Sequence, residues 1–216
     1  MSADPRTARG SLIVHARPVY RMIRAFLVVY LKLWHRLRIE GREHLPRAGG
    51  VLIASNHQSF LDIALVAVAA PRHVAFVARS TLARSRFVAF LMRQSGSVFV
   101  RQHTADRAAL EDMIAHLEHG DCVAVFPEGT RTRDGNLGPF RPGAAVAARR
   151  AGVPVVPMAI SGAFEALPRE RLFPRPTRIT VRFGPPLPPG GEYTLERARG
   201  TIAALLGPSV PSPNSE

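Results

Sequence analysis

A histidine and an aspartate stand five positions apart in the segment Asn56–Asp62. Free imidazole changes its charge near neutral pH, and a neighbouring carboxylate fixes its tautomer and stabilises the imidazolium, so such a pair can take the proton from a hydroxyl group. On one continuous helix the two side chains would stand about 140° apart and could not touch. We therefore expect His57 in a turn and Asp62 in the first turn of the helix that follows.

The same residues allow a structural interpretation. Ser59 and Asp62 have the spacing of a helix-capping pair, in which a hydroxyl and a carboxylate accept backbone N–H groups at a helix start. His57 would then be an ordinary surface residue. These residues alone leave both interpretations open.

A second polar segment, Phe126–Arg131, follows the apolar run Cys122–Phe126. It places a turn glycine between a carboxylate, Glu128, and a guanidinium, Arg131, which could hold an anionic substrate. Ligands bind at the carboxyl ends of strands in open α/β sheets, and this segment comes at such an end. The alternative is an exposed turn with solvated side chains.

The rest of the chain alternates between predicted strands and helices. Strands are expected at 51–55, 73–77, 96–100, 122–126, 154–160 and 178–184, and helices at 59–69, 80–93, 104–119, 143–151 and 194–206. This order predicts an α/β fold, a single layered domain whose mixed central sheet is flanked by helices. Pro154 and Pro157 favour an edge or bulged position for strand 154–160.

The N-terminal segment is strongly basic. Residues 1–47 carry nine Arg and one Lys against three acidic residues, within a chain of net charge +13. Basic residues recur at helical spacing (Arg17, Arg21, Arg24, Lys32, His35) opposite an apolar set (Val19, Ile23, Phe26, Leu27, Tyr30, Leu33, Leu37). This pattern predicts a basic amphipathic helix that lies in a membrane interface, or a helix that packs on the domain, and the two are compatible. We divide the chain into this segment, one larger domain at 48–206 and a disordered tail at 207–216.

Composition excludes several classes of protein. The only cysteine, Cys122, rules out a disulfide framework and indicates a reducing compartment. No histidine or cysteine spacing indicates a metal site, and no phosphate-binding glycine loop is present. A pI near 11.5 is compatible with nucleic-acid binding, but the chain has no motif of that class and only 7% aromatic residues.

These segments together resemble the 1-acylglycerol-3-phosphate O-acyltransferases and their glycerolipid acyltransferase relatives. The first family motif, Asn-His-x-x-x-x-Asp, is matched by Asn56–Asp62, and the third, Phe-Pro-Glu-Gly-Thr-Arg, by Phe126–Arg131. Val153–Gly162 is similar to the proline-rich fourth motif, and Pro139–Ala145 to the Phe-Lys-x-Gly stretch. The resemblance covers roughly residues 35 to 190.

The second family motif is matched less completely. Gly96–Val100 is similar to its Gly-x-Ile-x-Val core. A basic residue is usual where this chain has Gln102, and Lys is common where Arg79 stands. The neighbouring Arg101 could make the substrate contact in place of the residue at 102, or the acceptor could differ.

The resemblance implies direct acyl transfer to a lipid hydroxyl from a thioester, either acyl-CoA or acyl carrier protein, with no cofactor. His57 would be the general base and Asp62 its orienting partner, while the acceptor's phosphate and glycerol would be held by Glu128, Gly129, Thr130, Arg131 and Arg101. The acceptor is expected to be 1-acylglycerol 3-phosphate, with another lyso-lipid such as lyso-ornithine lipid as the alternative. A non-catalytic basic membrane-binding scaffold is the rival outside the enzymes. We expect peripheral attachment to anionic lipids on the cytoplasmic side of the cell membrane.

Overall fold

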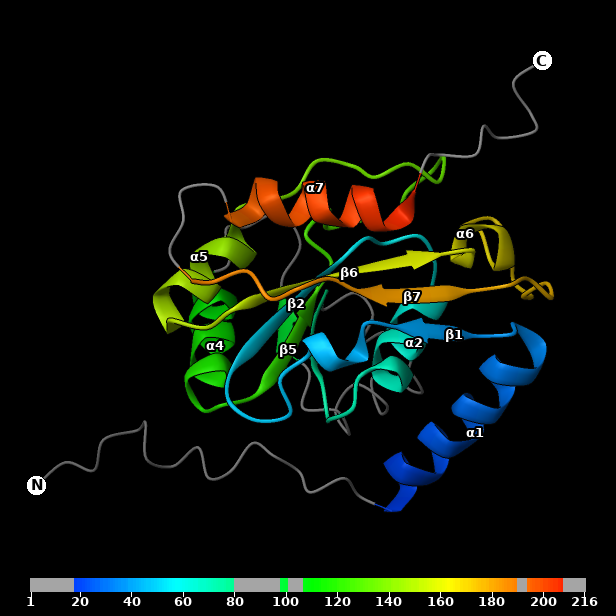
Figure 1. Ribbon diagram of the computed structural model, residues 1–216, viewed down its shortest axis with the longest axis horizontal. Coiled ribbons are helices and arrows are strands. Elements are labelled where there is room, and N and C mark those ends of the chain that lie inside the picture. The colour runs from blue at the N-terminus through cyan, green and yellow to red at the C-terminus, as the bar shows by residue number, and fades with distance from the viewer. Residues whose placement is uncertain (1–17, 80–97, 101–106, 190–193, 208–216) are drawn as a thin grey trace, which may run out of the picture.

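The computed structural model describes residues 18–79, 98–100, 107–189 and 194–207 (Figure 1). The strands within these ranges form a seven-stranded sheet in the order β1-β7-β6-β2-β5-β3-β4. They are β1 (Arg38–Glu40), β2 (Val51–Ser55), β3 (Ala75–Arg79), β4 (Val98–Val100), β5 (Cys122–Val125), β6 (Val155–Ser161) and β7 (Thr180–Phe183). The helices are α1 (Pro18–Trp34), α2 (Leu61–Ala69), α4 (Arg107–Glu118), α5 (Gly143–Ala151), α6 (Ala163–Ala166) and α7 (Thr194–Leu206), with a 3-10 turn η1 (Arg42–His44).

The sheet is mixed, as predicted. Strands β2 to β6 run parallel to one another, and β7 pairs antiparallel with β6 while β1 pairs parallel with β7. The carboxyl ends of β2, β5 and β6 therefore meet at one edge, near the middle of the sheet. The turn before β7 and the start of β1 lie at this same edge because those two strands run the other way.

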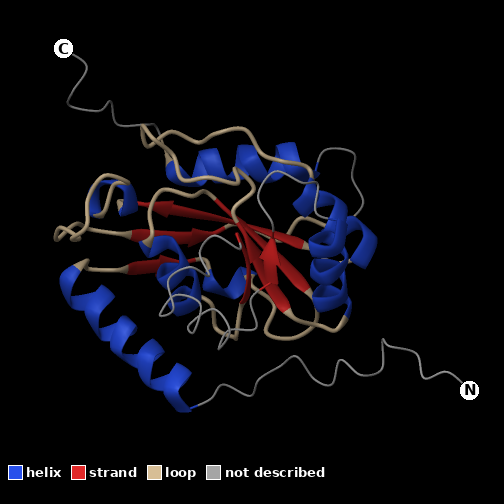
Figure 2. Ribbon diagram, turned by 180° about the vertical axis from the view of Figure 1, so that it is seen from behind, coloured by secondary structure: helices blue, strands red, loops and turns tan. Residues whose placement is uncertain are grey.

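Helices cover both faces of the sheet (Figures 1 and 2). Successive residues of a strand point to opposite faces, so β2 is apolar throughout and serves two cores. Val51 and Ile53 belong to the core beneath α1 and α2, whereas Leu52 and Ala54 belong to the core beneath α4, α5 and α7. The predicted α/β fold is confirmed.

Most predicted elements that fall on described residues are present, with ends shifted by a few residues. β1 and α6 were not predicted, because elements of three and four residues are too short to show periodicity. β1 joins the sheet although it lies inside residues 1–47, which were predicted to be a separate N-terminal segment. The division of the chain into domains stays a prediction. The predicted helix 80–93 and nearly all of the tail lie outside the described residues.

An edge or bulged position was predicted for strand 154–160, and the edge position is wrong. β6 is an interior strand between β2 and β7. Pro157 pairs with Ala54 of β2 and precedes Met158, where the register with β7 begins, so the N–H that proline lacks falls at the end of the β6–β7 ladder and not within it. The Pro157 carbonyl still accepts the Gly184 N–H at 2.8 Å.

The predicted division of the N-terminal helix into a basic and an apolar face is only partly right. Arg24 faces inward and donates to the carbonyl oxygens of Ala67, Val68 and Ala70 at the end of α2. His35 is fully buried. A guanidinium satisfies the unpaired carbonyls of a helix end and suits its negative dipole, so α1 uses a basic residue to dock onto the domain.

Candidate active site

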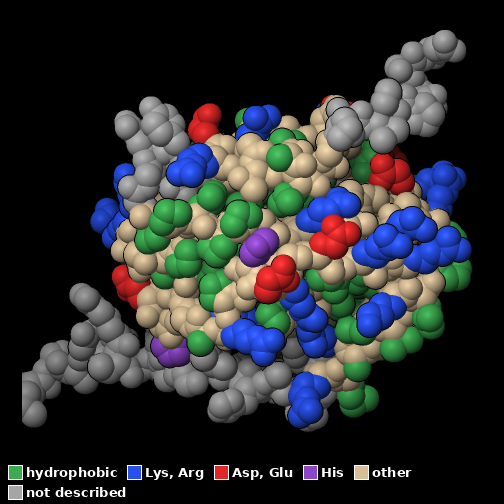
Figure 3. Space-filling view, in the orientation of Figure 1, with side chains coloured by type: hydrophobic (Ala, Val, Ile, Leu, Met, Phe, Trp, Pro, Cys, Tyr) green, Lys and Arg blue, Asp and Glu red, His purple; other side chains and the backbone are tan. Residues whose placement is uncertain are grey.

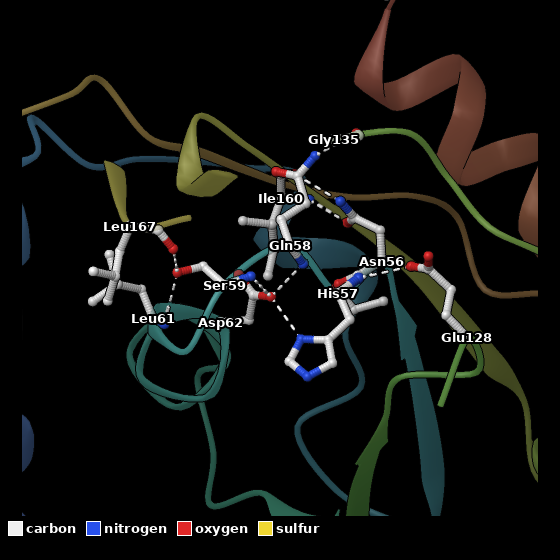
Figure 4. Close-up of polar contacts among 11 residues, drawn as sticks. Asn56, His57, Gln58, Ser59, Leu61, Asp62, Glu128, Gly135, Ile160 and Leu167 are labelled. Atoms are coloured by element: carbon white, nitrogen blue, oxygen red, sulfur yellow. Dashed lines mark hydrogen bonds and ion pairs between the residues drawn. The ribbon is translucent and has the colours of Figure 1, made fainter. Parts of the chain in front are cut away.

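His57 and Asp62 meet at the carboxyl end of β2 (Figure 4). His57 lies in the turn after the strand, Asp62 lies in the first turn of α2, and the distance from His57 Nδ1 to Asp62 Oδ2 is 2.8 Å. A carboxylate can only accept, so Nδ1 carries the proton and Nε2 presents its lone pair. The predicted placement of this pair is confirmed, and an imidazole held in this way is able to act as an oriented general base.

Asp62 also supports the turn itself. Its Oδ2 accepts the backbone N–H groups of Gln58 and Ser59, each at 2.7 Å, and the side chain is completely buried. Ser59 Oγ in turn accepts the N–H of Leu61 at 3.2 Å. The hydrogen bonds of the capping interpretation are present, and they are compatible with the catalytic interpretation, since one carboxylate oxygen fixes both the turn and the imidazole.

The His57 ring is packed as well as hydrogen-bonded. It stacks on Phe126, the residue that follows β5, with ring centroids 4.1 Å apart and an angle of 14° between planes. Its side chain is 17% exposed. The stacking limits rotation of the ring, so Nε2 keeps one direction away from Asp62 (Figure 4).

Asn56 locks this turn to the neighbouring strand. Its amide nitrogen donates to the Ile160 carbonyl at 2.8 Å, and its amide oxygen accepts the Ile160 N–H at 2.8 Å. The side chain replaces a ladder pair between β2 and β6 and is buried. The sequence showed Asn56 beside His57 but gave it no role, because Ile160 is 104 residues away.

Glu128 holds backbone in the segment after β5. Oε1 accepts the His57 N–H at 2.8 Å and Oε2 accepts the Gly138 N–H at 2.9 Å. Burial raises the pKa of the Glu128 carboxyl, and these two hydrogen bonds act against that rise. A Cβ at position 138 would lie 2.9 Å from Oε2, so a side chain there would displace the carboxylate. The predicted contact between Glu128 and an acceptor stays a prediction. In the structure, the Glu128 carboxylate accepts hydrogen bonds from the backbone of His57 and of Gly138.

Arg131 lies close to Glu128 in the same segment, and no carboxylate of the described residues forms a hydrogen bond or an ion pair with it. Its guanidinium carbon stands 3.7 Å from the centre of the Phe60 ring, and its Nη1 is buried with no hydrogen-bond partner. Desolvation lowers the pKa of Arg131, and the nearby cation Arg169 lowers it further. A buried guanidinium nitrogen without a partner is costly, and an anionic ligand would satisfy it.

A cavity of about 360 Å³ opens at this place. Its lining combines the predicted residues Glu128, Thr130 and Arg131 with a residue that the sequence did not indicate, Arg169. Arg169 comes from the turn before β7, and only the fold brings it here. Gly129, with φ of +69°, supplies the tight turn between Glu128 and Arg131.

Two expectations concern other residues. Arg101 and Gln102 lie outside the described residues, so the predicted contact of Arg101 stays a prediction. Among the side chains that the structure does describe, no group of histidine, cysteine or acidic residues is arranged to hold a metal ion.

Comparison with known proteins places this site in a family. The family model described as Acyltransferase matches residues 36–161, more than half of the chain. The chain belongs to the acyltransferase family. The resemblance inferred from the motifs is confirmed.

Named relatives of this acyltransferase agree. The chain is 32% identical over 185 residues to the 1-acyl-sn-glycerol-3-phosphate acyltransferase alpha of sheep, covering 82% of this chain and 64% of that protein. It is 26% identical over 145 residues to the 1-acyl-sn-glycerol-3-phosphate acyltransferase of Bacillus subtilis, covering 67% of this chain and 72% of that one.

The fold also has a solved counterpart. The 1-acyl-sn-glycerophosphate (LPA) acyltransferase PlsC of Thermotoga maritima superposes with a TM-score of 0.68 at 26% identity, covering 86% of this chain and 79% of that one. The acyltransferase thus spans less than two thirds of the sheep protein and most of the bacterial structure.

Proposed function

We propose that this acyltransferase moves a fatty acyl group from a thioester, acyl-CoA or acyl carrier protein, to the free hydroxyl of 1-acylglycerol 3-phosphate, giving phosphatidic acid. The observation that carries the proposal is the His57–Asp62 pair beside a cavity that holds an unpartnered buried guanidinium nitrogen of Arg131. A base for a hydroxyl and a site for a phosphate are the two requirements of this reaction.

The reaction needs no covalent enzyme intermediate. His57 Nε2 takes the proton of the acceptor hydroxyl while its oxygen attacks the thioester carbonyl. The C–S bond then breaks, and the thiolate leaves with the proton that His57 carried, which regenerates the base. Asp62 remains ionised and stabilises the imidazolium between the two steps.

The acceptor's phosphate belongs at Arg131 and Arg169. Two guanidinium groups on one cavity wall repel each other, and a phosphate dianion between them would relieve this repulsion. The charge of these two guanidinium groups favours a phosphate-bearing acceptor over a lyso-ornithine lipid. On the face of the molecule that Figure 3 draws, Lys and Arg side chains gather toward the right of the view.

The test is transfer of a labelled acyl group to a panel of lyso-lipids, with the product identified by mass spectrometry. Donors are acyl-CoA and acyl carrier protein, and acceptors are 1-acylglycerol 3-phosphate, lyso-ornithine lipid and a neutral monoacylglycerol. We expect phosphatidic acid from wild type and none from folded His57→Ala. Turnover of the lyso-ornithine lipid alone would contradict the proposed acceptor, and wild-type turnover by His57→Ala would contradict the mechanism.

We also propose that α1 attaches the enzyme to the cytoplasmic membrane surface without crossing it. One face of α1 packs on the domain through Leu31 and its neighbours, and the opposite face exposes a stripe of Met22, Phe26, Val29 and Leu33, each at least 56% exposed. The spacing of four, three and four residues places this stripe along one side of the helix. Arg21 and Lys32 are exposed on the same helix, where they could meet anionic lipids.

No helix among the described residues is both long and apolar enough to span a bilayer. Sedimentation with anionic and neutral liposomes tests the attachment. Phe26→Ser with Leu33→Ser should weaken binding to both, and high salt should weaken only the preference for anionic liposomes. Unchanged binding by the double variant would refute a role of this stripe.

A further inference from the structure

The turn between α6 and β7 exposes two large apolar side chains at its tip. Leu172 is 88% exposed and Phe173 is 82% exposed, more than any side chain of the α1 stripe. Single exposed apolar residues are common on protein surfaces, but adjacent ones at a loop tip require an explanation.

This turn is held in shape. The Arg175 N–H donates to the Ala166 carbonyl at 2.8 Å, and the Arg171 N–H donates to the Pro168 carbonyl at 3.2 Å. Prolines at 168, 174 and 176 restrict the backbone further. Leu172 and Phe173 are therefore presented outward at little conformational cost.

The apolar tip is surrounded by positive charge. Four arginines of the turn are exposed (Arg169, Arg171, Arg175, Arg178), and the single acidic residue among them is Glu170. Apolar side chains flanked by arginines suit the headgroup region of an anionic bilayer, where the apolar groups enter and the cations meet phosphates.

The turn adjoins the end of α1. The Ile179 N–H donates to the His35 carbonyl, and the Arg38 N–H donates to the Ile179 carbonyl, each at 3.0 Å. Figures 1 and 2 agree in placing this turn and the C-terminal end of α1 at the same end of the molecule. The α1 stripe and the tip can therefore meet one flat surface together.

The turn also adjoins the catalytic residues. Ser59 Oγ, next to the Asp62 carboxylate, donates to the Leu167 carbonyl at 2.8 Å, and Arg169 lines the cavity. Both ends of this connection lie at the sheet edge where β2, β5 and β6 terminate. A surface that touches the tip would thus lie close to the cavity.

We propose that Leu172 and Phe173 insert into an anionic bilayer as a second membrane contact beside α1. This contact sets the orientation of the enzyme and brings the cavity of Arg131 and Arg169 to the lipid surface, where the acceptor resides. The role given to this contact rests on the proposed lipid acceptor. The insertion itself concerns residues outside the motifs, so it can be refuted independently of the proposed function.

A single-tryptophan reporter tests the insertion directly. Trp34 is the only tryptophan of the chain, so Trp34→Phe with Phe173→Trp places one reporter at the tip. Its matched control is Trp34→Phe with Ala115→Trp, at an exposed site on α4 at the opposite end of the molecule. Vesicles of phosphatidylglycerol and phosphatidylcholine should shift the emission of the tip reporter to the blue, and brominated lipids should quench it, while the control stays unchanged.

Removal of the apolar groups gives the functional result. Leu172→Ser with Phe173→Ser should weaken binding to these vesicles by roughly tenfold or more, the loss expected for one largely buried apolar side chain. Transfer to vesicle-embedded acceptor should fall with it, and transfer to a short-chain soluble acceptor should be unchanged.

A tip reporter that behaves like the Ala115 control in the presence of vesicles overturns the inference. If that reporter shifts instead with acyl carrier protein, the surface belongs to the donor and the bilayer assignment is wrong. Blue shift and quenching at the tip of an enzyme that acylates no lyso-lipid would refute the proposed function and leave the membrane contact intact.

Discussion

Asp62→Asn removes one negative charge from the active site while nearly preserving the shape of the side chain. Asp62 Oδ2 accepts three N–H groups, whereas Oδ1 is buried without a partner. An amide can place its oxygen at the position of Oδ2 and its nitrogen at that of Oδ1. The turn before α2 should therefore survive, and the imidazolium of His57 should lose its counter-charge.

The size of the catalytic loss can be bounded from the geometry. At the observed 2.8 Å, a full ion pair in an effective dielectric of ~20 would be worth about 6 kcal/mol. Partial exposure of His57 screens this value, so it is a ceiling. Loss of an effective general base costs ~10²–10⁴ in rate, or about 2.7–5.4 kcal/mol, which lies below that ceiling. We expect a fall of this size, mostly in kcat, because the counter-charge acts on the developing imidazolium.

The stability change should be smaller. Hydrogen bonds to a charged acceptor exceed those to a neutral one by about 1 kcal/mol, so three weakened bonds correspond to about 1–3 kcal/mol once the relief of burying a charge is included. Thermal melts alongside initial rates with 1-acylglycerol 3-phosphate separate the two effects.

The chain supplies its own control for this substitution. His116 and Asp121 form a second pair with the same sequence separation and the same 2.8 Å distance, away from the cavity. Asp121→Asn should lower the melting temperature and leave kcat unchanged. A folded Asp62→Asn enzyme with wild-type kcat, or an equal loss of kcat in both variants, would refute the role given to Asp62.

Further substitutions test other parts of the structure. Arg131→Ala should lower kcat/KM by roughly 10- to 150-fold with a phosphate-bearing acceptor, since a charge-assisted hydrogen bond is worth ~1.5–3 kcal/mol. Arg131→Lys should recover only part of this loss because lysine lacks the planar fork of arginine. Wild-type kcat/KM in both variants would show that Arg131 is a solvated turn residue. Burial raises the pKa of Glu128 above its ordinary 4.5, so the unfolded chain releases this proton at a lower pH than the folded chain does. The contribution of Glu128 to the unfolding free energy should therefore fall as the pH rises from 4.5 through the folded pKa. Urea unfolding across this range should show that fall in wild type relative to Glu128→Gln, and parallel pH profiles would contradict it. Arg24→Gln should lower the free energy of unfolding by about 1–3 kcal/mol, because it removes the hydrogen bonds of Arg24 to the end of α2. Arg21 is exposed, so Arg21→Gln should leave the melting temperature unchanged and weaken binding to anionic liposomes. The reverse pattern would show that Arg24 is a lipid contact.

The position of the catalytic pair could be predicted because its determinants are local. His57 and Asp62 lie within one strand–turn–helix unit, and the helical geometry alone decides where each must stand. The segment after β5 could be placed beside them because the carboxyl ends of parallel strands share one edge. Local periodicity and the common edge of parallel strands were sufficient to place His57, Asp62 and the segment after β5 near one another.

The remaining site contacts depend on distant parts of the chain. Ser59 meets Leu167, which is 108 residues away, and Arg169 reaches the cavity only because β7 reverses direction beside β6. The edge position expected for β6 was wrong for a similar reason. The effect of Pro157 depends on the residue of β6 at which pairing with β7 begins, and the sequence around Pro157 does not reveal this. The inward direction of Arg24 likewise depends on the unpaired carbonyls of α2, which periodicity within α1 cannot reveal.

The Asn56–Ile160 bond also has a consequence for synthesis of the chain. At translation rates of ~5–20 residues per second, about 5–20 seconds separate the two halves of this bond as they leave the ribosome. α1 is made first, and its apolar stripe is available throughout that interval. On the proposed membrane attachment, the nascent chain can reach the lipid surface before β6 completes the turn that holds His57, so binding to the membrane would precede activity.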